Sequence, residues 1–342
     1  MKALVLKNPQ ELDLEDVPTP HIGSAEVLIR TAYAGICGTD RDLYLGLPGS
    51  AKADPPIILG HENSGRIAYV GSQVTGLAVG DNVAVDPNIY CHQCNYCRSG
   101  KPGLCSHLSA IGVTRNGGMA EYFSAPAEVV YKVPNGVALR EASMMEPISC
   151  AVHGVNLMAL RPNQKALVIG DGFMGQLFAQ ILQCYGLVQV DLAGISAEKL
   201  ALGRRLSNIH ATYKTDCETL PVEAYDLVVE AVGLPATQAQ AIQACRRGAQ
   251  VLMFGVGAPD AHFTMNTYDI YQKELTIKGS FINPLSCMDA ISLLESGRLN
   301  ISDLISHELK LEQVPELMEG KIGETTKALV TFPNSQELLK QP

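Results

Sequence analysis

The sequence has no tryptophan, no run of lysine and arginine residues, and no long hydrophobic segment. With no basic run and a formal net charge of −9, nothing in it predicts binding to nucleic acid or to an acidic membrane surface. No window approaches the roughly 20 apolar residues of a transmembrane helix, and the apolar stretch at residues 1–6 is too short for a signal peptide. We therefore expect a cytoplasmic protein. The absence of tryptophan excludes no function.

The composition is ordinary for a soluble globular protein, with 46% hydrophobic and 18% charged residues. A chain of 342 residues is long enough for about two domains, each with its own core. Residues 1–152 contain short apolar runs, such as 27–29, 66–70 and 82–85, separated by glycine and proline turns. This pattern predicts a β-rich, barrel-like domain.

Residues 153–284 change to alternating strand and helix patterns. The predicted strands are 166–169, 188–193, 227–230, 250–254 and 275–278, and the predicted helices are 176–186, 198–206 and 236–246. This alternation predicts an α/β domain with a doubly wound parallel sheet. The tail, residues 285–342, contains a predicted helix at 288–296 and a strand at 328–331, and we expect it to return to the first domain.

The segment Gly-Asp-Gly-Phe-Met-Gly at residues 170–175 lies between a predicted strand and a predicted helix. In that setting Gly-x-Gly-x-x-Gly is a dinucleotide-binding fingerprint. Gly170 allows the tight turn, Gly172 lets the backbone approach a pyrophosphate at the positive end of the helix, and Gly175 lets helix and strand pack closely. The sequence therefore predicts that this turn, with Phe173 and Met174, binds a nicotinamide dinucleotide.

Four of the ten cysteines lie within fifteen residues, with the spacing C-x2-C-x2-C-x7-C: Cys91, Cys94, Cys97 and Cys105. In a reducing compartment such clustering favours a metal over disulfides. Four thiolates close a tetrahedron around zinc and leave no position for a substrate, so the spacing predicts a structural zinc site. Unligated thiols and an iron–sulfur cluster are the alternatives.

A catalytic zinc needs three protein ligands and one open position. Candidates are Cys37, the adjacent pair His61 and Glu62, and the carboxylate of Glu146. None of them is decisive alone, since a lone cysteine in an apolar strand is usually part of the core and a lone His-Glu pair is usually at the surface.

Several motifs together resemble the medium-chain zinc dehydrogenases. They are Gly60-His61-Glu62-x2-Gly65-x5-Gly71-x2-Val74, Cys-Gly-Thr-Asp at 37–40, the four-cysteine segment, the Gly-x-Gly-x-x-Gly turn and Lys-Ala-Leu-Val at 327–330. They occur in the order of that family and cover essentially the whole chain. The resemblance is greatest to the sorbitol/polyol and threonine dehydrogenase branch, because Glu146 occupies a position that is cysteine in the ethanol-type branch.

The resemblance implies a GroES-like β-rich catalytic domain, formed by residues 1–152 and 285–342, and a Rossmann NAD(P)-binding domain at 153–284. It implies that Cys37, His61 and Glu62 hold a catalytic zinc and that Glu146 binds it directly or through water. Cys37 and one carboxylate would then about neutralise Zn²⁺. By the same resemblance Thr39 relays the substrate proton, and the chain forms a homodimer or homotetramer with two zinc ions per chain.

NAD-preferring sites carry an acid at the end of the second strand, where it accepts from the ribose 2′-hydroxyl. A gapless comparison with polyol dehydrogenases puts this position at Gly194, whereas Asp191 lies inside the predicted strand. A glycine removes the charge that would repel a 2′-phosphate, and Ser196 and Lys199 can receive that phosphate. We therefore expect NADP to be preferred; the alternative is that Asp191 contacts the ribose.

The substrate is a small molecule whose identity stays open. Sorbitol dehydrogenases have an arginine where this chain has Ser280, although Asn283 matches the family, so sorbitol itself is not supported. Tyr44 and Met119 are candidate pocket walls. The leading hypothesis is a polyol or ketose substrate. The alternatives are an L-threonine 3-dehydrogenase-like enzyme and a non-catalytic NAD(P)-binding relative.

Overall fold

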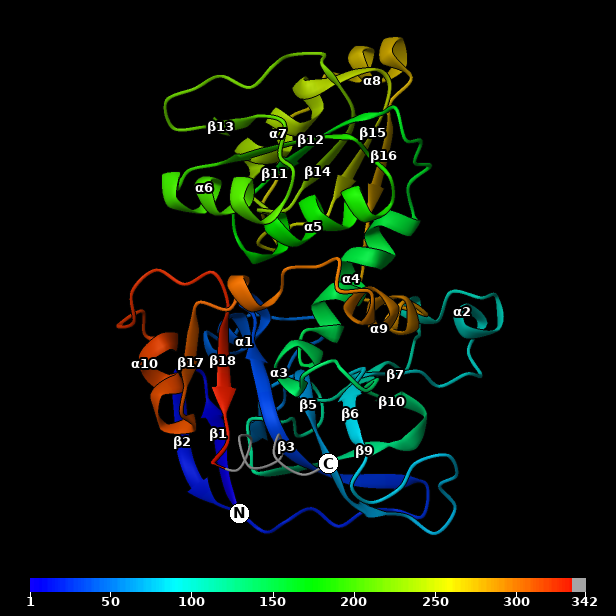
Figure 1. Cartoon of the computed structure of the whole chain (residues 1–342), viewed down its shortest axis with the longest axis vertical. Coiled ribbons are helices and arrows are strands. Elements are labelled where there is room, and N and C mark those ends of the chain that lie inside the picture. Colours follow the sequence, from blue (N-terminus) through cyan, green and yellow to red (C-terminus); the bar gives the residue numbers. More distant parts are fainter. Residues whose placement is uncertain (334–342) are drawn as a thin grey trace. The chain divides into compact units, whose positions relative to one another are not determined.

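The computed structural model describes residues 1–333 and separates the chain into two compact units. Among these residues, the first unit consists of Met1–Ser149, Pro284–Gly297 and residues 301–333, and the second of Cys150–Asn283 and Arg298–Asn300. In Figure 1 the first unit accordingly contains both the blue and the red parts of the chain. The division predicted from the sequence, at 152/153 and 284/285, differs from these limits by three residues at the first boundary and by one at the second. The prediction placed Arg298–Asn300 in the first domain, whereas they belong to the second unit.

The first unit is built on β-sheets. The largest has seven strands in the order β10-β6-β5-β3-β18-β17, with β9 also paired to β3. Its strands are β3 (Glu26–Ile36), β5 (Glu62–Val70), β6 (Asn82–Val85), β9 (Tyr122–Pro126), β10 (Val130–Lys132), β17 (His307–Leu309) and β18 (Ala328–Thr331). The smaller sheets contain β1 (Lys2–Asn8), β2 (Glu11–Asp16) and β4 (Ile57–Ile58), and β7 (Asn88–Ile89) with β8 (Ser109–Ala110). Strand β18 pairs antiparallel with β3, so residues 328–331 are part of the same sheet as the N-terminal strand β3.

Short helices complete the first unit. They are α1 (Gly38–Tyr44), α2 (Asn95–Arg98), α3 (Leu139–Ala142), α9 (Cys287–Glu295), α10 (Val314–Met318) and the 3₁₀ turns at Pro102–Leu104, Ala127–Val129, Ser302–Leu304 and Leu311–Gln313. Helix α4 (Met145–Asn156) connects the two units along the chain. Helix α4 is not among the elements predicted from the sequence. Its buried residues Ile148, Ala151, Val152 and Val155 nevertheless follow the helical spacing of three and four residues.

The second unit is a six-stranded sheet in the order β13-β12-β11-β14-β15-β16, with every pair parallel. The strands are β11 (Lys165–Ile169), β12 (Gln189–Gly194), β13 (Thr212–Lys214), β14 (Tyr225–Glu230), β15 (Cys245–Met253) and β16 (Thr276–Gly279). The helices are α5 (Phe173–Cys184), α6 (Ala197–Leu206), α7 (Pro235–Ala244) and α8 (Thr267–Lys273). The strand order reverses between β11 and β14, as at the switch point of a dinucleotide-binding sheet. The predicted fold class is thus confirmed.

Most predicted elements of the second unit differ by a few residues from those observed, and the largest difference lies where α7 ends and β15 begins. Helix α7 ends at Ala244, not at residue 246, and β15 begins at once with Cys245, which is fully buried and pairs with Tyr225. Burial of Cys245 in the sheet therefore overrides the helical pattern at 245–246. Strand β13 was not predicted, because three half-buried residues give no periodic signal.

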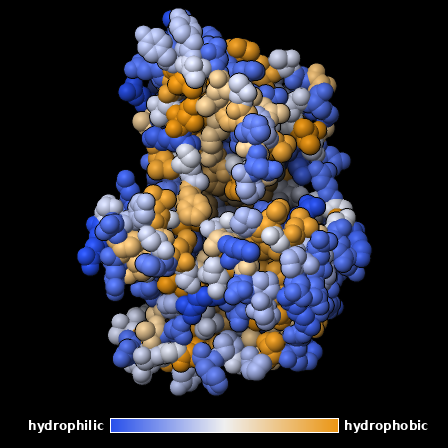
Figure 2. Space-filling model, turned by 180° about the vertical axis from the view of Figure 1, so that it is seen from behind, coloured by the Kyte–Doolittle hydropathy of each residue, from blue (hydrophilic) through white to orange (hydrophobic). Residues whose placement is uncertain are grey.

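The surface mixes polar and apolar residues. Hydrophilic residues cover much of the face in Figure 2, with smaller hydrophobic groups between them, as is usual for globular surfaces. Within residues 1–333 no helix combines the length and apolarity needed to cross a membrane.

Candidate active site

Cys37, His61 and Glu62 come together in the first unit. Each offers a ligand atom, and these atoms all lie within 4.8 Å of one another. Cys37 follows the end of β3, and Glu62 opens β5, the antiparallel neighbour of β3. The pairing of Gly35 with Glu62 thus brings together Cys37 and Glu62, which are 25 positions apart in the sequence. His61 and Glu62 are buried, with 6% and 0% of their surface exposed.

A glycine is required opposite Glu62. A Cβ atom on Gly35 would lie 1.9 Å from Glu62 Oε2. Any other residue would displace this carboxylate. The missing side chain at Gly35 therefore makes the room that Glu62 occupies among the candidate ligands.

Asp40 supports the imidazole of His61. Its Oδ1 lies 3.3 Å from His61 Nδ1, its Oδ2 accepts a hydrogen bond of 2.9 Å from the Cys37 backbone N–H, and the side chain is fully buried. Burial alone would lower the pKa of His61, but the facing Asp40 carboxylate and the Cys37 sulfur outweigh it and hold this pKa well above 6.5. A carboxylate behind an imidazole is the usual partner of a metal-binding histidine, since it fixes the ring and leaves the other nitrogen to the metal.

Lys327 pairs with Glu62, although no role was assigned to it from the sequence. Its Nζ donates a hydrogen bond of 2.6 Å to Glu62 Oε1 and lies 2.5 Å from Oε2, and its side chain is 5% exposed. Burial lowers the pKa of Lys327, but the charges of Glu62, Cys37 and Glu146, together with the hydrogen bond to Glu62, outweigh this effect and the net shift is upward. The charge balance inferred from two ligands alone is therefore incomplete. Beside the candidate ligands Cys37 and Glu62, Asp40 adds a negative charge and Lys327 adds a positive one.

Glu146 and Thr39 lie outside this group of three. Glu146, in the first turn of α4, is 8% exposed, and its charge contributes to the raised pKa of Lys327. Its role as a direct or water-mediated ligand stays a prediction. Thr39, in the first turn of α1, has no hydrogen-bond partner for Oγ1 within residues 1–333, while its Cγ2 lies against Gly49. The hydroxyl is thus available to a ligand.

The four cysteines of the second cluster also converge. The ligand atoms of Cys91, Cys94, Cys97 and Cys105 lie within 4.8 Å of one another. Backbone N–H groups point at the sulfurs, for example from Cys94 to Cys91 Sγ at 3.3 Å and from Cys91 to Cys105 Sγ at 3.4 Å. Backbone hydrogen bonds from Cys97 and Ser106 lower the pKa of Cys94 to about 5. Four sulfurs with supporting amides fit a closed zinc site.

The glycine-rich turn has the geometry that its sequence requires. Gly170 has a φ of +127°, and a Cβ on Gly175 would lie 1.7 Å from the Gly170 carbonyl oxygen. A Cβ on Gly172, by contrast, would contact nothing within 4 Å, so the backbone is open there. Gly172 caps α5, which starts with Phe173 and Met174. The first amides of α5 thus face an open side, as an anion site needs.

The tip of β12 carries the residues expected to select the cofactor. Gly194 is the last residue of β12, and Ser196 caps α6 by accepting from the Lys199 backbone N–H at 3.4 Å. Asp191 is 2% exposed and accepts hydrogen bonds from the Tyr225 hydroxyl at 2.8 Å and the Ala211 backbone N–H at 3.0 Å. Because Asp191 is engaged inside the unit, this geometry favours the hypothesis based on Gly194.

Other candidate positions have different surroundings. Tyr44 and Met119 are 6% and 0% exposed and belong to a hydrophobic core cluster, so they are core residues rather than pocket walls.

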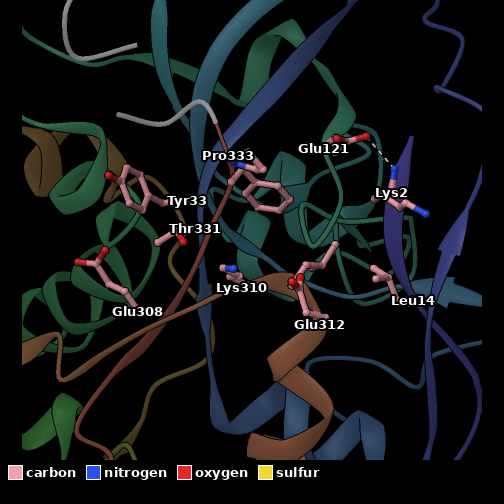
Figure 3. Close-up of a pocket in the computed structure, with 11 residues that line it drawn as sticks. Lys2, Leu14, Tyr33, Glu121, Glu308, Lys310, Glu312, Thr331 and Pro333 are labelled. Atoms are coloured by element: carbon pink, nitrogen blue, oxygen red, sulfur yellow. Dashed lines mark hydrogen bonds between the residues drawn. The ribbon is translucent and has the colours of Figure 1, made fainter. Parts of the chain in front are cut away.

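Figure 3 shows a pocket of about 570 Å³ in the first unit, where Glu121 accepts a hydrogen bond from the Lys2 backbone N–H. None of the candidate metal ligands lines this pocket. It is therefore separate from the candidate active site.

The fold and the two ligand clusters define the class of a zinc-binding dehydrogenase, and comparison with known proteins agrees. A family model described as the alcohol dehydrogenase GroES-like domain matches residues 23–135, and one described as zinc-binding dehydrogenase matches residues 174–296. D-arabinitol dehydrogenase 1 of Uromyces fabae is 32% identical over 98% of this chain and 97% of its own length. The chain therefore belongs to the zinc-dependent medium-chain dehydrogenases, as its motifs indicated.

Two further comparisons extend this result. D-altritol 5-dehydrogenase of Agrobacterium fabrum is 31% identical, over 94% of this chain and 95% of its own length. A crystal structure described as a zinc-binding dehydrogenase from Sinorhizobium meliloti 1021, bound to NADP, superposes with a TM-score of 0.93 at 30% identity, covering 97% of this chain and 99% of that one. The similarity thus includes both units.

Proposed function

We propose that this protein is a zinc-dependent oxidoreductase that transfers hydride between NAD(P) and the secondary alcohol, or the ketone, of a polyol or related sugar derivative. The observation that carries the proposal is the group formed by Cys37, His61 and Glu62, braced by Asp40 and Lys327. The names of the relatives, which act on D-arabinitol and D-altritol, support a polyol substrate.

The buried residues each have a definite task in this reaction. When bound by Cys37, His61 and Glu62, zinc supplies Lewis acidity, which lowers the pKa of a coordinated hydroxyl or polarises a carbonyl. Asp40 keeps the His61 ring oriented, and Lys327 compensates the charge of Glu62. We assign the first step of proton removal to Thr39 Oγ1, which has no other partner within residues 1–333.

The remaining residues supply cofactor binding and stability. The turn from Gly170 to Gly175 holds the pyrophosphate of NAD(P), and the open backbone at Gly172 supports this assignment. Gly194, Ser196 and Lys199 support binding of NADP, as does the NADP found in the Sinorhizobium meliloti protein. The four-cysteine cluster holds a second, structural zinc. The family resemblance also supports a homodimer or homotetramer in the cytoplasm.

A substrate screen tests the proposal. The zinc-loaded protein is incubated with sugar alcohols, ketoses and L-threonine, each with NAD(H) and NADP(H), and the absorbance of the reduced nicotinamide is followed. We expect turnover of at least one polyol–ketose pair and none by the Cys37→Ser variant. A clear preference for L-threonine would replace the polyol assignment with the amino-acid alternative. No turnover by a protein that binds two zinc ions and a cofactor would favour a non-catalytic relative.

A further inference from the structure

Asp171, the second residue of the glycine-rich turn, reaches across to the tip of β12. Its Oδ2 accepts hydrogen bonds from the backbone N–H groups of Ile195 at 2.8 Å and Ser196 at 2.7 Å. Strands β11 and β12 are parallel neighbours, so the turn after β11 and the tip of β12 lie at the same edge of the sheet (Figure 1). The carboxylate therefore joins the pyrophosphate turn to the segment expected to face the ribose.

The same carboxylate fills the space of the side chain that Gly194 lacks. A Cβ on Gly194 would lie 2.3 Å from both Asp171 Cγ and Oδ2. An acid at the end of the second strand is what selects a ribose 2′-hydroxyl in NAD-binding sheets. Here the strand-end position has no side chain, but a carboxylate supplied by the preceding turn lies directly beside it.

One oxygen of Asp171 is still available to a ligand. Both amide hydrogen bonds end on Oδ2, and Oδ1 has no partner within residues 1–333. A carboxylate oxygen can accept from a ribose hydroxyl, whereas a 2′-phosphate beside it would place two anions in contact. The backbone N–H groups of Ile195 and Ser196 are also unavailable to such a phosphate, because both already donate to Asp171 Oδ2.

We propose that Asp171 discriminates between the two cofactors, by favouring the ribose 2′-hydroxyl of NAD(H) and opposing the 2′-phosphate of NADP(H). The inference rests on the proposed use of NAD(P) and concerns the same cofactor site. Gly194, Ser196 and Lys199 admit the phosphate, and Asp171 acts against it. The affinity ratio of the two cofactors is thus a balance between groups on two different turns.

The test is equilibrium binding, not turnover. NADH and NADPH are titrated into the zinc-loaded full chain, and dissociation constants are taken from the fluorescence of the bound reduced nicotinamide. Asp171→Asn keeps an oxygen acceptor and removes the charge. We expect it to tighten NADPH binding relative to NADH by about tenfold or more, the size expected for losing one close charge in a partly solvated site. Asp269→Asn, on α8 of the same unit, removes one charge elsewhere and should leave the ratio unchanged.

A second variant keeps the test decisive if Asn at this position disturbs folding. Asp171→Ala removes the carboxylate and releases both amides, so the ratio should shift in the same direction. An unchanged ratio in a folded variant would show that Asp171 only braces the loop, and the inference would be overturned. If the unsubstituted protein bound neither cofactor, the proposed function itself would fail, which is a different result.

Discussion

The ion pair between Lys327 and Glu62 allows a quantitative test of how the candidate site is held. Both side chains are almost fully buried, with 5% and 1% exposure, and Nζ lies within 2.6 Å of both carboxylate oxygens. The substitution Lys327→Met keeps most of the aliphatic volume and removes the charge. It leaves the Glu62 carboxylate buried without its cation. Removing one partner of a buried pair costs about 3–5 kcal/mol, or roughly a 10²–10⁴-fold change in the unfolding equilibrium.

The loss in free energy of unfolding caused by Lys327→Met should depend on whether zinc is bound. In the metal-free protein Glu62 has lost its cation, so the full cost applies. In the zinc-loaded protein the bound ion again faces the carboxylate, and the loss in free energy of unfolding should be clearly smaller. Because the chain has no tryptophan, unfolding in urea is followed by far-ultraviolet circular dichroism, with and without zinc.

Two controls isolate the pair. Lys321→Met removes an exposed lysine that pairs with Glu319, and it should have almost no effect on unfolding. Adding Glu62→Gln to Lys327→Met removes the unpaired charge, and this should recover part of the lost stability in the metal-free protein. If Lys327→Met cost no more than Lys321→Met, the buried pair would not stabilise the site and our account of its charge balance would be wrong.

Two further predictions separate the tasks of individual residues. Cys37→Ser should reduce bound zinc from two ions to one and abolish activity with the fold intact. Cys94→Ser should also bind one ion but mainly lose stability, since structural zinc contributes folding energy. Metal analysis with thermal unfolding measures both effects, and an equal loss of folding in the two variants would contradict this division of roles. Gly172→Ala should weaken NADH binding and leave the free energy of unfolding unchanged, because the added Cβ meets no protein atom. Gly175→Ala should reduce both the free energy of unfolding and NADH binding, because its Cβ would lie 1.7 Å from the Gly170 oxygen. Cofactor titration and urea unfolding of the two variants test this, and similar behaviour of both would refute it.

The local geometry of the sites that are formed by short motifs could be predicted from the sequence. The turn at 170–175 is predicted from three glycines between a strand and a helix. In the structure Gly170 has a positive φ and Gly175 leaves no room for a Cβ, whereas Gly172 meets no protein atom and leaves the backbone open. The four cysteines were likewise assigned from spacing alone. In both cases all the interacting residues are close in the sequence, so their spacing along the chain is enough to predict that they lie close together.

The supporting charges were not predicted, because their partners are far apart in the sequence. Lys327 and Glu62 are 265 residues apart, and their contact exists only because β18 pairs with β3 beside β5. Asp40 was part of a quoted motif, but its pairing with His61 depends on the β3–β5 register. Helix α4 was not predicted, although its buried residues follow helical spacing.

Asp171 shows why a residue missing from one position does not mean that its chemical group is missing from the site. The glycine at 194 predicts a site without an acid only if the strand end is the sole segment that can supply one. In the folded chain the turn after β11 ends next to the tip of β12, so either segment can place a carboxylate in the same volume. Both cannot do so together, because a side chain at 194 would collide with Asp171. Cofactor selection in this protein should therefore be analysed from positions 171 and 194 as a pair.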